Sequence, residues 1–246
     1  MKWNKKISLL RLGVSILGKF GYKIYSKNEF LTPYSELYLT KTFSKKDKLL
    51  IFDVGAHRGE TVSRLIKLFP NSKVLCFEPF PDSFQHLKSF EAENIVLHNF
   101  GFSDNSGTED FFVNHGSATN SLLRSSENAE HTWGNPEVYN QKSKISCEFT
   151  TMDSFISENN ISSIDFLKID VQGAEHKVLA GAIETLSQKI PKLIQLEIIL
   201  GDTYEGQKSM GYYTNFLEKY GYCTIMISDM AFINNKLVQI DLFASC

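Results

Sequence analysis

The chain has 246 residues, of which 42% are hydrophobic and 22% are charged, and its formal net charge is −2 at pH 7. This length is enough to bury the core of one domain, and the near-balance of charge gives no general attraction to nucleic acid. The 4 cysteines have no C-x-x-C spacing, which argues against a zinc site or a disulfide framework and fits a reducing cytoplasm.

The N-terminal residues form a basic amphipathic segment. Its charged residues before Glu29 are all positive: Lys2, Lys5, Lys6, Arg11, Lys19, Lys23 and Lys27. Apolar residues at helical spacing share one face of residues 1–27, but Arg11 and Lys19 interrupt them too early for a membrane span. We expect residues 1–47 to be a helical extension that packs on the main domain or on a second subunit of a homo-oligomer. Peripheral contact with an anionic membrane is the alternative.

A buried strand, a glycine turn and a helix are expected next. Residues 49–52 are an unbroken apolar run, followed by Asp53, Gly55 and Gly59, and residues 60–69 have apolar side chains at helical spacing. This order opens nucleotide sites in doubly wound sheets. The Asp-x-Gly-x-x-x-Gly spacing differs from that of dinucleotide enzymes, and an ordinary strand-to-helix turn is also compatible with it.

A second buried strand is expected at residues 73–78 and ends on Glu78. An acidic residue about 20 positions after the glycine turn is suited to accept both hydroxyls of a ribose. Pro79 stops the strand because proline has no N–H for the ladder. A solvated strand end is the alternative interpretation of Glu78.

The remaining chain alternates between strand and helix patterns. The expected elements are a helix at 82–90, strands at 94–99 and 108–113, a strand at 145–151, a helix start at 151–157, a strand at 164–170, a helix at 174–186, a strand at 193–200, a helix at 210–220, and strands at 222–227 and 237–243 joined by Asn234-Asn235. This order predicts an α/β fold with a mostly parallel sheet and an antiparallel last strand.

A polar stretch without periodicity spans residues 114–144. Stretches of this length in a compact domain are lids, binding loops or disordered segments. We expect a lid over the acceptor, in which Asn120 and Ser121 bind hydroxyl groups and Trp133 offers a face to a sugar ring. A disordered surface insertion is the alternative.

Three motifs together resemble the FkbM family of S-adenosylmethionine-dependent methyltransferases. They are Phe52-Asp-Val-Gly-Ala-His-Arg-Gly59, Phe77-Glu-Pro-Phe-Pro-Asp-Ser-Phe84 and Lys168-Ile-Asp-Val-Gln-Gly-Ala-Glu175. The resemblance implies a class I methyltransferase domain over residues 48–246, with a Rossmann-like, mostly parallel seven-stranded sheet, helices on both faces and an antiparallel last strand. It also implies S-adenosylmethionine as cofactor and methyl transfer, most often to oxygen, on a sugar, a glycan or a secondary metabolite.

The resemblance also implies roles for individual residues. Asp53, Gly55, His57 and Gly59 match the cradle of the methionine part, Glu78 the ribose contact, Ser103 and Asp104 the adenine contact, and Asp170 the border of the transferred methyl group. Members of the family often have Val-Glu-Gly where this chain has Val171-Gln172-Gly173. We therefore give Gln172 no role.

A hydroxyl acceptor must lose a proton as it attacks, so a base is needed. His57, Asp170 and Glu197 are the candidates, and Glu175 is a candidate for base or acceptor contact. For His57, a backbone bond at the helix N-terminus is the alternative. Two scattered carboxylates are weak grounds for a divalent ion, so we expect no metal.

Two other functions compete with methyl transfer. An NAD-dependent oxidoreductase uses a similar sheet, but the third dinucleotide glycine and an evident hydride-site pair are missing. A non-catalytic nucleotide-binding module would keep the fold without activity.

Overall fold

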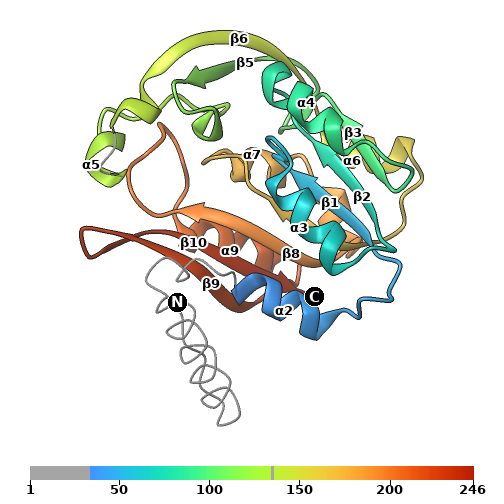
Figure 1. The fold of residues 1–246 in the computed structure, drawn as a ribbon. Coiled ribbons are helices and arrows are strands. Elements are labelled where there is room, and N and C mark those ends of the chain that lie inside the picture. Colours follow the sequence, from blue (N-terminus) through green and yellow to red (C-terminus); the bar gives the residue numbers. More distant parts are fainter. Residues whose placement is uncertain (1–33, 134–135) are drawn as a thin grey trace, which may run out of the picture. The chain divides into compact units, whose positions relative to one another are not determined.

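The computed structural model describes residues 34–133 and 136–246 (Figure 1). The chain divides into two compact units, residues 1–34 and 35–246. The expected amphipathic helix lies outside the described residues. Helix α2 (Tyr34–Thr42) falls almost wholly in the second unit, where Leu39 is buried and the Tyr38 ring lies 5.5 Å from that of Phe243. The second unit thus begins before residue 48, and the division into extension and catalytic domain stays a prediction.

One mixed sheet of seven strands carries the fold, in the order β3-β2-β1-β7-β8-β10-β9. Its strands are β1 (Leu50–Val54), β2 (Lys73–Phe77), β3 (Ile95–His98), β7 (Ile164–Ile169), β8 (Pro191–Ile199), β9 (Cys223–Ile233) and β10 (Lys236–Ser245). β1, β2, β3, β7 and β8 pair in parallel, and β10 is antiparallel to both β8 and β9. The expected sheet with an antiparallel last strand is therefore confirmed.

Helices cover both faces of the sheet because strand side chains alternate between the two faces. Ile51 and Val74 face a core with Val62 and Leu65 of α3. The opposite face contributes residues such as Phe52 to a second core. The first face carries α2, α3 (Glu60–Leu68) and α4 (Pro81–Leu87), which runs into η1 (Lys88–Phe90), and the second carries α6 (Met152–Glu158), α7 (Glu175–Ala180), α8 (Ile183–Ser187) and α9 (Met210–Lys219).

The single helix expected at residues 174–186 is instead two short helices, α7 and α8. They are separated at Gly181 and Ala182, which do not continue the helical path. A Cβ at Gly181 would overlap the backbone carbonyl of Ser103. The break therefore lies where the backbone of Gly181 packs against the backbone of Ser103. A side chain larger than that of glycine would prevent this contact.

A second sheet of three strands, β4-β6-β5, lies apart from the main sheet (Figure 1). It consists of β4 (Gly101–Phe102), β5 (Gly107–Asn114) and β6 (Gln141–Thr150). β5 and β6 pair antiparallel from Gly107 opposite Phe149 to Asn114 opposite Gln141. Residues 115–140 connect the end of β5 to the start of β6.

Residues 115–140, which we call the capping segment, are not a structureless loop. Its elements are η2 (Ser117–Thr119), α5 (Ala129–Trp133) and η3 (Pro136–Tyr139), with residues 134 and 135 outside the description. Ala129 and Tyr139 form a small core with Tyr204. Trp133 stacks on Tyr139 at 6.0 Å, and its indole donates to the Thr203 hydroxyl at 3.0 Å. Trp133 therefore holds the segment to the loop before α9, and its expected contact with a sugar ring stays a prediction.

The C-terminal hairpin is longer than the sequence pattern predicts, but its turn is as expected. Asn234 and Asn235 have φ values of 49° and 61°, which asparagine tolerates in two-residue hairpin turns. Within the described part of the chain, no helix has the length and apolarity needed to cross a membrane.

The glycine turn after β1 gives a test of the fold. Gly55 has φ +82°, and a Cβ there would overlap the backbone carbonyl of Asp170, whereas Gly206 has φ +80° and nothing within 4 Å of that position. Gly206→Ala should therefore cost only the left-handed strain of about 1–2 kcal/mol. Gly55→Ala should cost at least about 3 kcal/mol more, because the strand ends must separate.

Urea unfolding of the two variants measures this difference, with Gly206→Ala as the matched control. Equal losses of unfolding free energy would show that the approach of Gly55 to Asp170 does not constrain the fold.

Candidate active site

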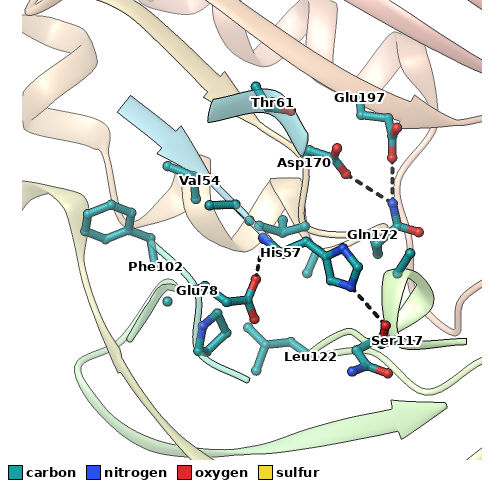
Figure 2. Close-up of a pocket in the computed structure, with 18 of the residues that line it drawn as sticks. Val54, His57, Thr61, Glu78, Phe102, Ser117, Leu122, Asp170, Gln172 and Glu197 are labelled. Carbon is teal, nitrogen blue, oxygen red and sulfur yellow. Dashed lines mark hydrogen bonds between the residues drawn. The ribbon is translucent and has the colours of Figure 1, made fainter. Parts of the chain in front are cut away.

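A cavity of about 390 Å³ lies over the carboxyl ends of β1, β2, β7 and β8. The strand order reverses between β1 and β7, and such reversals leave a crevice in which α/β proteins bind ligands. Figure 2 shows His57, Glu78, Asp170, Gln172 and Glu197 reaching this cavity from the strand ends, with Ser117 of η2 opposite them.

Glu78 forms one wall of the cavity directly after β2. Its side chain is 5% exposed, and its two oxygens accept hydrogen bonds from the backbone N–H groups of His57 and Phe80, each at 2.8 Å. Burial raises the pKa of Glu78 from 4.5 to about 7, although these bonds act against the rise. Each carboxylate oxygen accepts more than one bond, so Glu78 can still accept from two neighbouring hydroxyls.

Asp170 lies at the end of β7 and is paired with a buried lysine. The Lys168 ammonium is 2.7 Å from Asp170 Oδ2 and 3.9 Å from Asp53 Oδ1. Burial by itself raises the pKa of Asp170, but the lysine charge and the hydrogen bonds it receives outweigh burial and hold the pKa below its usual value. Burial lowers the pKa of Lys168, but the two carboxylates outweigh this, so its pKa is raised. Asp170 is therefore an anion at neutral pH.

Asp53 lies behind this pair and does not line the cavity. It is fully buried, and neither carboxylate oxygen has a hydrogen-bond partner among the described residues. Burial raises its pKa to about 6, while Lys168 acts in the opposite direction. Buried carboxylates are costly, and among the described residues the Lys168 ammonium at 3.9 Å is the ion-pair partner of Asp53, which lies next to the strand end that carries the glycine turn.

His57 follows the glycine turn with φ 48°. Its Nε2 is 3.0 Å from the Ser117 hydroxyl, and its Nδ1 is 3.4 Å from a carboxylate oxygen of Glu60. Burial lowers the pKa of His57, although Glu60 raises it in part. The ring is therefore neutral at pH 7, and a tautomer with its proton on Nδ1 leaves Nε2 free to accept a proton.

Glu197 faces Asp170 from β8. Its oxygens accept from the side-chain amides of Gln172 at 2.7 Å and Gln239 at 2.6 Å. Burial and the nearby Asp170 charge raise the pKa of Glu197 well above its usual value. The pKa values of the two carboxyl groups are thus shifted in opposite directions, that of Asp170 downward and that of Glu197 upward, so Asp170 is the more readily ionised of the two.

The structure brings half of the expected site residues to the cavity. Those that line it are Gly55, His57, Glu78, Asn120, Asp170 and Glu197, and those that do not are Asp53, Gly59, Ser103, Asp104, Ser121 and Glu175. Their roles stay predictions. Ser117, Glu60 and Gln172 also line the cavity but were not expected to. Glu60 lies three residues after His57, which is the one signal that pointed to it.

Several residues outside the cavity have other partners. The Glu175 carboxylate accepts from the backbone N–H groups of Val171 and Gly173, both at 3.1 Å. Asp104 pairs with Lys177 at 3.0 Å. Ser121 donates to the Gln172 carbonyl at 2.8 Å. These side chains therefore stabilise the loops around the cavity.

The far wall of the cavity is apolar. Pro79, Phe102 and Leu122 line it where Ser103 and Asp104 were expected. A flat ring system fits such a wall, whereas the opposite end, with its carboxylates, fits hydroxyls and cations. Within the described residues, no group of three or more His, Cys, Asp or Glu side chains is placed to hold a metal ion.

Comparison with known proteins agrees with this geometry. Residues 53–223 match the methyltransferase FkbM domain. The chain is also 30% identical over 173 residues to the 2-O-methyltransferase NoeI of Sinorhizobium fredii, a match that covers 66% of this chain and 68% of that protein.

Two solved structures share the fold. The methyltransferase FkbM from Methylobacillus flagellatus KT superposes with a TM-score of 0.53 at 18% identity, over 87% of this chain and 47% of that one. This chain thus spans less than half of that structure. The magnesium protoporphyrin IX methyltransferase from Synechocystis PCC 6803, solved with bound S-adenosylmethionine, has a TM-score of 0.50 at 11% identity, over 86% of this chain and 76% of that one. The fold is therefore that of a class I methyltransferase.

The cavity fits S-adenosylmethionine by the chemistry of its walls. The cofactor combines a cationic methionine part with a ribose diol and a flat adenine ring. Glu78 and the anionic Asp170 complement the diol and the cationic part, and Phe102 and Leu122 offer apolar surface to a ring. Asp53, whose oxygens accept no hydrogen bond from the described residues, lies behind the same strand end.

The raised pKa of Glu78 predicts how stability changes with pH. Because the folded-state pKa is about 7 against 4.5, the contribution of this group is fully present below 4.5 and is lost as pH rises through 7. Wild type should lose about 2–3 kcal/mol of unfolding free energy through this group over that interval. Glu78→Gln should lack that part of the pH dependence.

The substitution also adds a destabilising offset that is the same at every pH, because an amide N–H would face a backbone N–H. That offset does not titrate, so the slope is the quantity to compare. Exposed Glu91→Gln is the control. Parallel stability curves for wild type and Glu78→Gln would contradict the assignment.

Proposed function

This chain belongs to the FkbM family of S-adenosylmethionine-dependent methyltransferases, and from that premise we propose that it methylates a hydroxyl oxygen of a sugar, a glycan or a similarly hydroxylated metabolite. The observation that carries the proposal is the neutral His57 beside the Ser117 hydroxyl, 3.0 Å away, in the cavity. An unprotonated base within reach of the hydroxyl is what an oxygen acceptor requires. The name of the relative in Sinorhizobium fredii, a 2-O-methyltransferase, supports oxygen over nitrogen or carbon.

Cofactor binding falls to the strand ends in this proposal. Glu78 would accept from the ribose hydroxyls while its own backbone bonds fix the carboxylate plane. The turn at Gly55 would let the ligand approach the backbone without meeting a Cβ. When bound, S-adenosylmethionine supplies an activated methyl group on a sulfonium. Asp170, held by Lys168, would offer a fixed negative charge to that cationic part.

Proton removal falls to His57. The acceptor hydroxyl would lie against Nε2, the position that the Ser117 hydroxyl marks. As the oxygen gains the methyl group, its proton would pass to Nε2 and give an imidazolium. Glu60, 3.4 Å from Nδ1 and 63% exposed, would hold the Nδ1 proton and stabilise this cation near solvent. Glu197 is less suited to the role because both of its oxygens already accept hydrogen bonds, from the side-chain amides of Gln172 and Gln239.

The acceptor would be held by the capping segment. η2 places Ser117 and Ala118 at the cavity, and Asn120 follows. Asn120 Oδ1 accepts from the backbone N–H of Asn114 at 2.8 Å, while its amide nitrogen is buried without a partner among the described residues. The N–H groups of that nitrogen would donate hydrogen bonds to an acceptor hydroxyl. A closed capping segment would also exclude water from the reacting atoms.

Methyl transfer itself can be tested with labelled S-adenosylmethionine and fractionated glycans and small metabolites. We expect label in one hydroxyl-bearing fraction and a methyl ether in the product. Label on nitrogen, or none above a no-enzyme control in any fraction, would contradict the proposal.

His57→Asn isolates the proposed base. Asparagine tolerates the left-handed backbone of this position but cannot accept the proton. The turnover number should fall by about 10²–10⁴, while affinity for S-adenosylhomocysteine in calorimetry stays within about threefold. His86, which is exposed on α4, provides the matched control His86→Asn. Full turnover in His57→Asn would remove His57 from this role.

A further inference from the structure

Gln172 occupies a special position at the mouth of the cavity. It lies just after β7 with φ 55°, a left-handed conformation that is uncommon for a residue other than glycine. Figure 2 shows its amide nitrogen between Asp170 and Glu197. The feature that favours a glutamine at this position is the set of hydrogen bonds made by its side-chain amide.

Both the nitrogen and the oxygen of the Gln172 side-chain amide have hydrogen-bond partners. Its nitrogen donates to Asp170 Oδ1 at 3.1 Å and to Glu197 Oε2 at 2.7 Å. An amide nitrogen has two hydrogens, so each carboxyl group receives one. Oε1 accepts from the Tyr204 hydroxyl at 3.1 Å. The reverse orientation would place the amide oxygen against both carboxyl groups, so the network fixes the amide.

The same residue joins the capping segment to the sheet. The Tyr204 hydroxyl also lies 2.9 Å from the carbonyl of Thr119 in η2, so its single hydrogen is shared between Gln172 and η2. The Ser121 hydroxyl donates to the backbone carbonyl of Gln172 at 2.8 Å. Gln172 thus contacts β8 through Glu197 and the capping segment through Tyr204 and Ser121.

The charges around Gln172 explain why an amide suits this place better than a carboxylate. The ionisable groups that act on the cluster are Asp53 of β1, Lys168 and Asp170 of β7, Glu175 of α7, Glu197 of β8, Asp241 of β10, Tyr139 of η3 and Tyr204. Lys168 is the cation paired with Asp170, and Arg64 also lines the cavity. A further carboxylate would add a negative charge and remove both donors.

We propose that Gln172 is a positioning residue for methyl transfer, whose amide holds the Asp170 and Glu197 carboxyl groups together at the cavity wall and ties them to the capping segment. The inference rests on the proposed function, because the wall it orders is the boundary between the cofactor and the acceptor. It assigns no chemical step to Gln172. Gln172 instead fixes the positions of the cavity wall and of η2, against which both ligands are placed.

The isosteric variant Gln172→Glu tests this with S-adenosylhomocysteine as the probe, titrated by calorimetry at about pH 5.5, 7 and 8.5. When protonated, the introduced carboxyl both donates and accepts. Its burial beside Asp170 keeps it protonated at the low end, so affinity there should be within about threefold of wild type at the same pH. At about pH 8.5, where it ionises, affinity should be at least about tenfold weaker than wild type.

Exposed Gln141→Glu is the matched control and should follow wild type at every pH. A loss in Gln172→Glu that is equal at all three pH values, or absent at all three, overturns the proposal. Both outcomes can be measured without a known acceptor. A failure of this proposal is therefore distinguishable from a failure of the proposed methylation.

Tyr204→Phe tests the same proposal if Gln172→Glu does not fold. It removes only the hydroxyl between Gln172 and Thr119. Amide hydrogen exchange over residues 117–122 should become at least about fivefold faster in Tyr204→Phe and in Gln172→Ala. Unchanged exchange in both variants would show that Gln172 does not hold the capping segment.

Discussion

The close approach of the β1 turn to the end of β7 is the constraint on which the site depends. The Gly55 N–H bonds to the Phe77 carbonyl, and the Asp170 N–H bonds to the Val54 carbonyl, both at 3.0 Å. Only a residue without a Cβ fits where Gly55 meets Asp170. The ends of β2 and β7 are therefore each joined by a hydrogen bond to the end of β1, which lies between them. Side chains that leave these ends must converge, and so a buried carboxylate, a histidine and an ion-paired aspartate share one cavity.

The electrostatics of the cavity follow from the same crowding. Burial raises the pKa of Glu78 to about 7 and that of Glu197 well above its usual value. Lys168 compensates Asp170, whose pKa is lowered. Four acidic residues, Glu60, Glu78, Asp170 and Glu197, line the cavity with one basic residue, Arg64, while Lys168 pairs with Asp170 from behind the wall. This excess of acidic side chains favours a cationic ligand such as a sulfonium over a negatively charged one.

The sequence predicts the parts of this site that are set locally. Strands, the glycine turn and Glu78 follow from apolar runs and from spacing within about 30 residues. The partners of His57 and Gln172 do not, because Ser117 is 60 positions from His57 and Tyr204 is 32 positions from Gln172. For Glu175, a position at a helix start is compatible with contact either to a ligand or to the backbone. In the structure it is 1% exposed and accepts from the backbone N–H groups of Val171 and Gly173, contacts that depend on packing. The break between α7 and α8 has a similar origin in the contact of Gly181 with Ser103.

A crystal structure of the complex with S-adenosylhomocysteine tests this site most directly. We expect both ribose hydroxyls within hydrogen-bond distance of the Glu78 carboxylate, the adenine ring against Phe102 and Leu122, and the sulfur directed toward the space between His57 and Asp170. Ligand density elsewhere in the chain, or a ribose that leaves Glu78 without contact, would contradict this expectation.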